Sequence, residues 1–187
     1  MKKIMFNDRY GLTQAVLEGS KTMTRRIVPA KLVRAIVGGA PGFAVMESRY
    51  KVGEVVAVAQ NYKDAGLDPK NCDKFQLVVY GDFPPRHRHG WTNKMFVSAD
   101  LMPHQIRITN VKVERLQDIS DEDCIREGIS FMPGGYYVNY RRGPLGRDWL
   151  SDKSYRSAFA ALIDKVSGKG TWASNPYVFV YEFELVK

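Results

Sequence analysis

Cysteine is scarce in this chain: Cys72 and Cys124 are the only two among 187 residues, and they lie in unrelated contexts. Two isolated cysteines exclude a disulfide framework and are typical of reduced thiols in a cytosol. Long apolar runs are missing as well, because no window holds the ~18 apolar residues that a membrane span needs. The segment Met1–Asp8 contains two lysines but no apolar core of a secretion signal. We therefore expect a cytoplasmic protein without a membrane partner.

Acidic residues are sparse at the amino-terminal end. Residues 1–50 contain nine Lys or Arg and three Asp or Glu, a net charge of +6. Because the whole chain carries +8, the remaining residues contribute only +2. A one-ended cationic excess favours an anionic partner, and phosphate is the commonest candidate. Solubility alone is the alternative explanation.

Repeats and low-complexity tracts are also missing, and a composition of 44% hydrophobic and 26% charged residues is that of a globular protein. The length fits one domain, with or without long insertions. The hydrophobic patterns predict helices at 12–18, 30–37, 120–128 and 154–166, and strands at 55–59, 75–80, 106–116 and 177–185. Because strands and helices do not alternate regularly, we expect an α+β fold with a small, mostly antiparallel β-barrel and short flanking helices.

The densest group of functional side chains lies between Gly19 and Arg26, in the sequence Gly-Ser-Lys-Thr-Met-Thr-Arg-Arg. This stretch combines a flexible glycine, three hydroxyls, one ammonium and two guanidiniums. Arginine offers forked donors, lysine a point charge and hydroxyls rotatable partners, which suit phosphates and base edges. The alternative interpretation is a solvated edge strand whose charges prevent association.

The spacing Gly19-x-Lys21-x-x-x-x-Arg26 resembles the GxKxxxxR signature of ASCH domains, which have a PUA-like β-barrel fold. Four further features are similar to phage- and bacteria-borne ASCH proteins: the helix before Gly19, Gly53-Glu-Val-Val entering a strand, Leu101-Met-Pro103 with the segment up to Gly128, and Trp172-x-x-Asn175-Pro176 with the last strand.

This resemblance covers roughly residues 10–60, 94–130 and 155–186. It implies a single ASCH-like domain over 1–187, with insertions at about 62–93 and 131–150. The chain departs from the family at Ala57–Gln60, where relatives often carry Trp-Val-Arg-Glu, so any role of that arginine or acid is lost here.

The first function that the resemblance implies is binding of RNA or a modified pyrimidine nucleoside in a basic cleft. The residues expected to bind the nucleic acid or nucleoside are Gly19, Lys21, Thr22, Arg25, Arg26 and Lys94. The Tyr- and Arg-rich stretch 136–149 either stacks bases or is an ordinary hairpin with packed tyrosines. We expect no cofactor and no metal, because the cysteine and histidine spacings fit no standard zinc pattern.

The second function is enzymatic, since some small bacterial ASCH proteins are amidohydrolases that remove the acetyl group from N4-acetylcytidine. The catalytic lysine, threonine and glutamate of those proteins correspond by position to Lys21, Thr24 and Glu127. In this scheme Thr24 attacks the amide carbonyl and a desolvated Lys21 takes its proton. Glu127 protonates the departing nitrogen or activates water.

Strand geometry sets a condition on this scheme, because Lys21 and Thr24 are three residues apart and point to opposite faces of a regular strand. They converge only if the chain turns between them.

A third possible function is a non-enzymatic adaptor that works through protein contacts, which predicts an exposed apolar patch.

Overall fold

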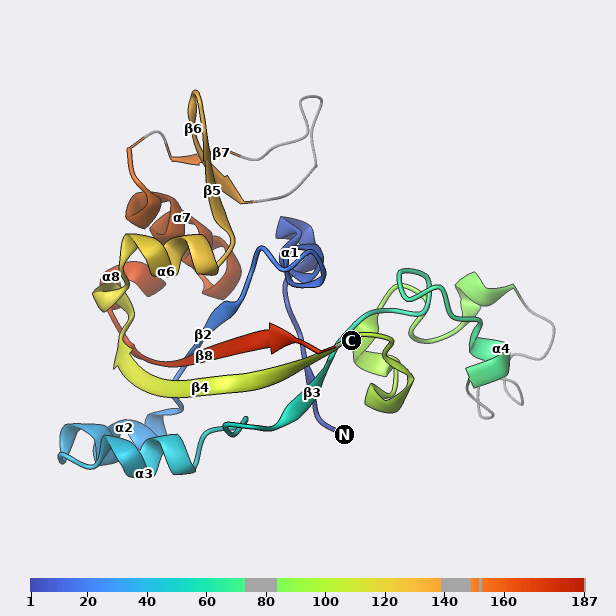
Figure 1. Ribbon diagram of the computed structural model, residues 1–187, viewed down its shortest axis with the longest axis horizontal. Coiled ribbons are helices and arrows are strands. Elements are labelled where there is room, and N and C mark those ends of the chain that lie inside the picture. The colour runs from blue at the N-terminus through green and yellow to red at the C-terminus, as the bar shows by residue number, and fades with distance from the viewer. Residues whose placement is uncertain (73–83, 139–148, 152, 187) are drawn as a thin grey trace. The chain divides into compact units, whose positions relative to one another are not determined.

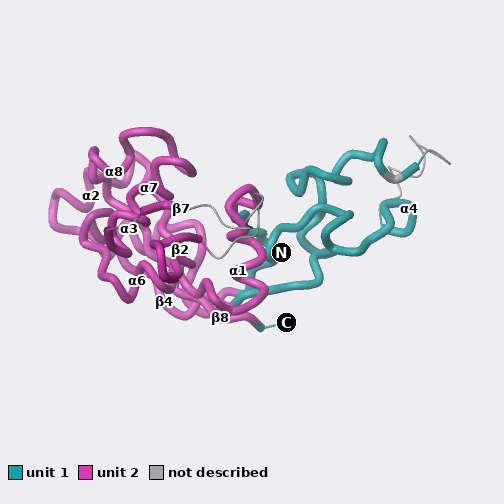
Figure 2. The backbone as a smooth tube through the Cα atoms, turned by 90° about the horizontal axis from the view of Figure 1, so that it is seen from above, with its two compact units in different colours: residues 1–6, 55–106, 186–187 teal, residues 7–54, 107–185 magenta. Residues whose placement is uncertain are grey.

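The computed structural model describes residues 1–72, 84–138, 149–151 and 153–186. The predicted strand at 75–80 lies outside the described residues, and so do Tyr140 and the three arginines of the Tyr- and Arg-rich stretch. The chain divides into two compact units, which Figure 2 distinguishes by colour. Unit 1 comprises residues 1–6, 55–106 and 186–187, and unit 2 comprises residues 7–54 and 107–185. The single ASCH-like domain stays a prediction.

Unit 1 is built on a short parallel pair of strands. Its main elements are β1 (Lys3–Ile4), β3 (Val55–Val58) and α4 (Pro69–Cys72). Lys3 pairs with Ala57 in parallel register. A small apolar core forms where Ala57 packs with Tyr62, Val97 and Met102.

Unit 2 contains the other α-helices and strands, which Figure 1 labels. Its helices are α1 (Leu12–Leu17), α2 (Ala30–Val37), α3 (Pro41–Met46), α6 (Asp121–Arg126), α7 (Tyr155–Ser167) and α8 (Thr171–Ser174). Its strands are β2 (Met23–Ile27), β5 (Ile129–Met132), β6 (Gly135–Val138), β7 (Trp149–Ser151), β8 (Tyr177–Leu185) and β4 (Gln105–Arg115), which begins at the end of unit 1.

The strands form two sheets, so the predicted α+β class is confirmed. The larger sheet has the order β1-β3-β4-β8-β2 and the smaller one the order β5-β6-β7. β1 pairs with β3 in parallel and β2 with β8 antiparallel, so the larger sheet is mixed. Because β1 and β2 stand at the two ends of that order in the described residues, closure into a barrel stays a prediction.

Most elements follow the sequence patterns. The helices at 12–17, 30–37, 121–126 and 155–167 and the strands at 55–58, 105–115 and 177–185 match the predictions within a few residues. Helix α3 was not expected, because Gly38, Gly39 and Pro41 indicate a helix end; the proline instead occupies the first turn of a new helix. At Thr109–Asn110, where the sequence pattern predicts a bulge or turn, β4 continues, and the two residues are both exposed between the buried Ile108 and Val111. Across the described ranges, no helix combines the length and apolar character needed to cross a membrane.

Helix α6 begins with a side-chain cap that matters for the site described below. The Ser120 hydroxyl accepts a hydrogen bond from the Asp123 amide at 3.1 Å. We expect Ser120→Ala to lower the free energy of unfolding by about 1 kcal/mol, because the first turn of α6 loses this acceptor. Urea unfolding measures the change, and Ser167→Ala at the exposed end of α7 is the control. Equal stability of the two variants would contradict the capping role.

Candidate functional site

Lys21 lies in a turn between α1 and β2. Helix α1 ends at Leu17, Gly19 follows with a positive φ of 74°, and the Lys21 amide donates to the Ala15 carbonyl at 2.9 Å. Because β2 begins only at Met23, Lys21 does not belong to the strand. The alternation of strand faces therefore does not fix where its side chain points.

The Lys21 ammonium contacts Glu127, the residue at the carboxyl end of α6. It donates to the Glu127 carboxylate oxygen Oε2 at 2.5 Å and to the Glu127 carbonyl at 2.8 Å. The two side chains are only 2% and 5% exposed. Gly128 follows with a φ of 100°, and a Cβ placed there would lie 3.7 Å from the Lys21 Cβ. The chain is thus closely packed around this pair.

Burial lowers the pKa of Lys21 from its ordinary value of 10.5, while the Glu127 carboxylate acts in the opposite direction. The cationic side chains of Arg26 and Arg25 lower it further. Lys21 is therefore easier to deprotonate than a surface lysine, which is a property of lysines that act as bases.

This shift predicts a dependence of stability on pH. Between the lowered pKa and 10.5, the unfolded state binds more protons at Lys21 than the folded state, so the free energy of unfolding rises with pH. We expect wild type to gain stability, relative to Lys21→Met, as the pH rises toward 10.5. Urea unfolding at a series of pH values below 10.5 measures the two slopes, and parallel slopes would show that the pKa of Lys21 is not lowered by folding.

Arg25 is enclosed by carboxylates from three positions. Its side chain is 1% exposed, and its Nη2 donates to Glu114 at 2.7 Å and to Asp123 at 2.6 Å. Nε also donates to Glu114, at 3.1 Å, and Nη1 donates to the Glu127 oxygen Oε1 at 3.2 Å. The face of the guanidinium lies over Phe159 of α7. A phosphate would have to displace these carboxylates to reach Arg25, so its geometry fits an internal role better than the predicted ligand contact.

Thr24 and Arg26 share the other face of β2. Thr24 is directly opposite Tyr181 in the register with β8, so the two side chains point to one side of the sheet. Tyr181 in turn packs edge-on against Tyr50. Arg26 is partly exposed, and burial lowers its pKa, while the Tyr50 hydroxyl and the Glu127 carboxylate oppose that shift. Arg26 thus connects the Thr24 face electrostatically to Glu127.

The structure brings two of the three predicted catalytic residues into contact. Lys21 and Glu127 meet, whereas no hydrogen bond joins Thr24 to either of them in the described part of the chain. Thr24 is nevertheless buried, with 5% of its surface exposed. For Thr24 to act as a nucleophile with Lys21 as its base, their side chains must come within hydrogen-bond distance when a substrate binds.

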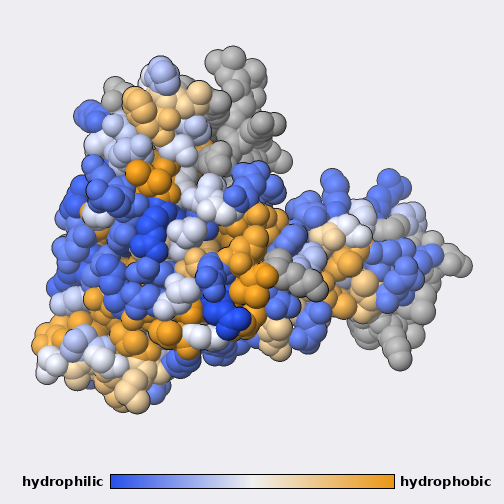
Figure 3. Space-filling model, viewed as in Figure 1, coloured by the Kyte–Doolittle hydropathy of each residue, from blue (hydrophilic) through white to orange (hydrophobic). Residues whose placement is uncertain are grey.

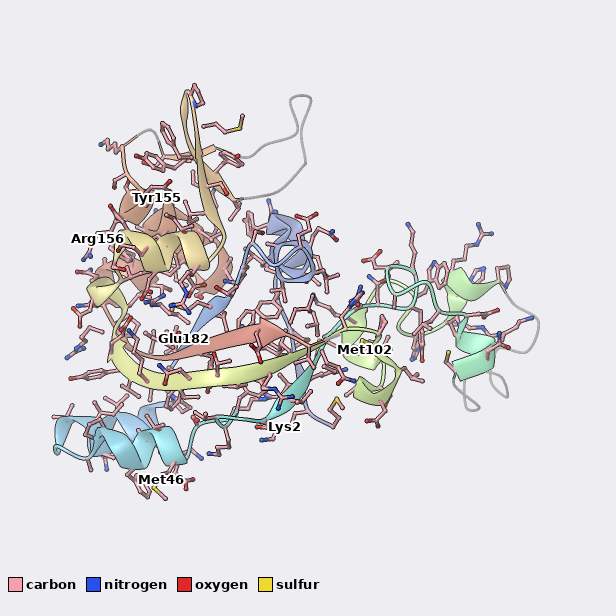
Figure 4. The ribbon with its side chains drawn as sticks, in the orientation of Figure 1. Lys2, Met46, Met102, Tyr155, Arg156 and Glu182 are labelled. Carbon is pink, nitrogen blue, oxygen red and sulfur yellow. The ribbon has the colours of Figure 1, made fainter. Side chains whose placement is uncertain are left out.

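The other predicted binding residues, Thr22, Gly19 and Lys94, differ in their surroundings. Thr22 accepts a weak hydrogen bond of 3.5 Å from Arg126, which forms an ion pair with Glu182 at 2.6 Å. Figure 4 labels Glu182 on β8. Gly19 is exposed and, with its positive φ, lies in the turn that follows α1. Lys94 belongs to unit 1, where its ammonium donates to the Phe6 carbonyl at 2.5 Å.

Sequence reasoning missed Glu114 and Asp123. Glu114 is a single acid near the end of a strand, and Asp123 is one of three acids in the first turn of α6, which helix capping explains by itself. Cys124 is buried, and burial raises the pKa of its thiol to about 12. In the described ranges, no group of three His, Cys, Asp or Glu residues is arranged to hold a metal ion.

The aromatic residues of the hairpin β5–β6 pack on one another. The Tyr136 ring lies 4.7 Å from the Tyr155 ring and 5.0 Å from the Phe131 ring, measured between centroids. Tyr155 is labelled at the start of α7 in Figure 4. These contacts favour the interpretation of the stretch as an ordinary hairpin over that of a base-stacking platform.

Comparisons of the chain with protein-family models, with curated proteins and with solved structures give no match. The resemblance to ASCH domains therefore stays a hypothesis that rests on the motifs. The geometry defines, independently of any family, a cluster in unit 2 in which the buried cations Lys21 and Arg25 contact the carboxylates of Glu114, Asp123 and Glu127.

Proposed function

We propose that unit 2 binds a pyrimidine nucleoside, free or within RNA, beside Lys21 and Glu127, in a fold of the PUA-like kind. The observation that carries the proposal is the contact between these two residues, which are 106 positions apart in the sequence. A buried ion pair adds little net stability, because the cost of desolvating two charges offsets their attraction. Groups with perturbed pKa values concentrate at functional sites, which favours a functional reason for retaining the pair.

The donors and acceptors of the pair suit the edge of a cytosine. A carboxylate accepts from the exocyclic amino group of cytosine, as Glu and Asp do in base readout. The Lys21 ammonium is a donor for the neighbouring ring nitrogen or carbonyl oxygen. Arg26, partly exposed on the neighbouring strand face, is placed to contact the sugar or a phosphate.

Access to the pair requires a local movement, because both side chains are almost fully buried in the ligand-free protein. Residues of α1 cover this region: Leu12 and Ala15 both lie within 4 Å of a Cβ placed at Gly128. We therefore include in the proposal a displacement of α1 when the base enters. Short helices joined by glycine turns open at low cost compared with the core of a sheet.

The proposal is tested by calorimetric titration of the purified protein with cytidine, N4-acetylcytidine, uridine and a short cytidine-rich RNA. We expect saturable binding of at least one cytidine ligand by wild type and none by Lys21→Ala. Affinity for RNA that falls with salt would indicate additional phosphate contacts. Full affinity of Lys21→Ala, or no binding of any of the four ligands by wild type, would contradict the proposal.

Hydrolysis of N4-acetylcytidine is the second candidate function, and the lowered pKa of the buried Lys21 favours it. A neutral Lys21 accepts the Thr24 proton as the hydroxyl attacks the acetyl carbonyl. Lys21 passes this proton through the contacting Glu127 carboxylate to the departing cytosine nitrogen, and water then hydrolyses the acetyl-threonine ester, which releases acetate and restores the Thr24 hydroxyl. Chromatography of cytidine release tests the activity. Loss of release in Thr24→Ala and Glu127→Gln, but not in the exposed Thr109→Ala, is the expected pattern.

The adaptor function also has an observation in its favour. Val37, Phe43 and Met46 are each more than half exposed on the α2–α3 pair. Figure 3 shows apolar residues gathered over these helices and hydrophilic ones over α6, and Figure 4 labels Met46 on α3. The adaptor function predicts two results: wild type binds no nucleoside, and the Phe43→Ser variant no longer binds a protein partner that wild type binds.

A further inference from the structure

We infer that Arg25 is a positioning residue for Glu127: Glu114 and Asp123 hold its guanidinium so that it takes one oxygen of the Glu127 carboxylate and leaves the other for Lys21. This inference rests on the proposed function, because positioning has meaning only if Glu127 and Lys21 meet a ligand. It changes the role of Arg25 from the expected nucleic-acid contact to an internal support.

The first support is the division of the Glu127 carboxylate between two cations. Oε2 receives the Lys21 ammonium at 2.5 Å, and Oε1 receives Nη1 of Arg25 at 3.2 Å. A carboxylate that contacts one cation is free to rotate about its last torsion, because the angles of that torsion are broadly distributed and roughly two-fold symmetric. With a cation on each oxygen, the plane of the carboxylate is fixed.

The second support is that Arg25 itself is fixed from two other elements. Glu114 on β4 accepts from both Nε and Nη2, and Asp123 on α6 accepts from Nη2. Arginine is the side chain suited to this task, because its planar fork presents several donors in a rigid arrangement. The three carboxylates on Arg25 therefore come from three places: Glu114 from β4, Asp123 from the first turn of α6 and Glu127 from the carboxyl end of α6.

The third support is the charge balance. Three charged groups act on Lys21: Glu127 from the end of α6, and Arg25 and Arg26 from β2. Both arginines disfavour the protonated form of Lys21. Glu127 favours the protonated form, and it does so more strongly the more of its charge is directed at Lys21. By drawing Oε1 away, Arg25 keeps Lys21 closer to the neutral state.

Arg25→Lys tests the inference, since an ammonium keeps the charge but does not span Glu114, Asp123 and Glu127 together. Two quantities are measured on the full chain: the affinity for cytidine by calorimetry, and the titration of Lys21 by NMR of lysine-labelled protein. Lys21→Met identifies the Lys21 signal. The matched control is Arg107→Lys on the exposed part of β4, whose ion pair with Glu184 is long at 3.6 Å.

We expect Arg25→Lys to weaken cytidine binding at least tenfold and to raise the pKa of Lys21 by about one unit, with the control unchanged. An unchanged Lys21 titration together with unchanged affinity in a folded variant would overturn the inference and leave Arg25 a purely structural residue. If wild type binds no cytidine, the proposed function fails, and the Lys21 titration alone still decides whether Arg25 orients Glu127. If Arg25→Lys does not fold, Asp123→Asn replaces it, with the same direction of both changes expected and their absence equally decisive.

Discussion

Arg25→Met is expected to lower the free energy of unfolding by about 3–5 kcal/mol, because it removes the cation that three carboxylates share in a buried place. The guanidinium is 1% exposed, and the side chains of Glu114 and Asp123 are 14% and 16% exposed. Methionine has a similar length and fills the space, so the loss reports the charge and its hydrogen bonds rather than a cavity. Urea unfolding followed by circular dichroism measures the difference.

The comparison variant is Arg126→Met, which removes a short ion pair with Glu182 and a long one of 3.8 Å with Asp123, in a more exposed place. Arg126 contacts Glu182 at 2.6 Å, as Arg25 contacts Asp123, but its side chain is 39% exposed. Surface ion pairs of this kind contribute at most about 1 kcal/mol. Similar losses in the two variants, or a loss below 1 kcal/mol in Arg25→Met, would show that the carboxylate cluster does not depend on Arg25.

The sequence predicted the pieces of this cluster better than their arrangement. The GxKxxxxR spacing and the acid before Gly128 single out Lys21 and Glu127, and the structure brings their side chains into contact. The pattern also assigned Arg25 to ligand binding, because a sequence does not show which cations find internal carboxylates. Burial of Arg25 depends on Glu114 and Asp123, which approach it from elements 89 and 98 positions away.

The same limit applies to the fold. Local patterns specify helices and strands, so α7 and β8 were predicted almost to the residue. Strand order depends on long-range pairing, and the parallel pairing of β1 with β3 involves a two-residue strand with no recognisable alternation. Helix α3 was missed because a proline after two glycines indicates both the end of one helix and the first turn of another.

Replacing both members of the Lys21–Glu127 pair is expected to separate stability from function. Glu127→Met alone leaves the buried Lys21 ammonium without its carboxylate, and we expect a loss of about 3–5 kcal/mol in unfolding free energy. Lys21→Met alone should cost less, because Glu127 keeps the contact with Arg25. In the double variant no ammonium remains to be compensated, and Arg25 keeps Glu114 and Asp123.

The double variant should therefore be more stable than Glu127→Met alone and lie within about 2 kcal/mol of wild type, since apolar replacements of buried pairs are often neutral. Cytidine binding, in contrast, should be lost in all three variants, because none retains both the ammonium and the carboxylate. Urea unfolding and calorimetry on the same four samples, wild type included, give both quantities. A double variant that is stable and still binds cytidine would show that the pair is not kept for the ligand and only links the α1–β2 turn to the end of α6. A double variant that regains stability and has lost all affinity would show that the buried pair is kept for the ligand, since the fold does not need it.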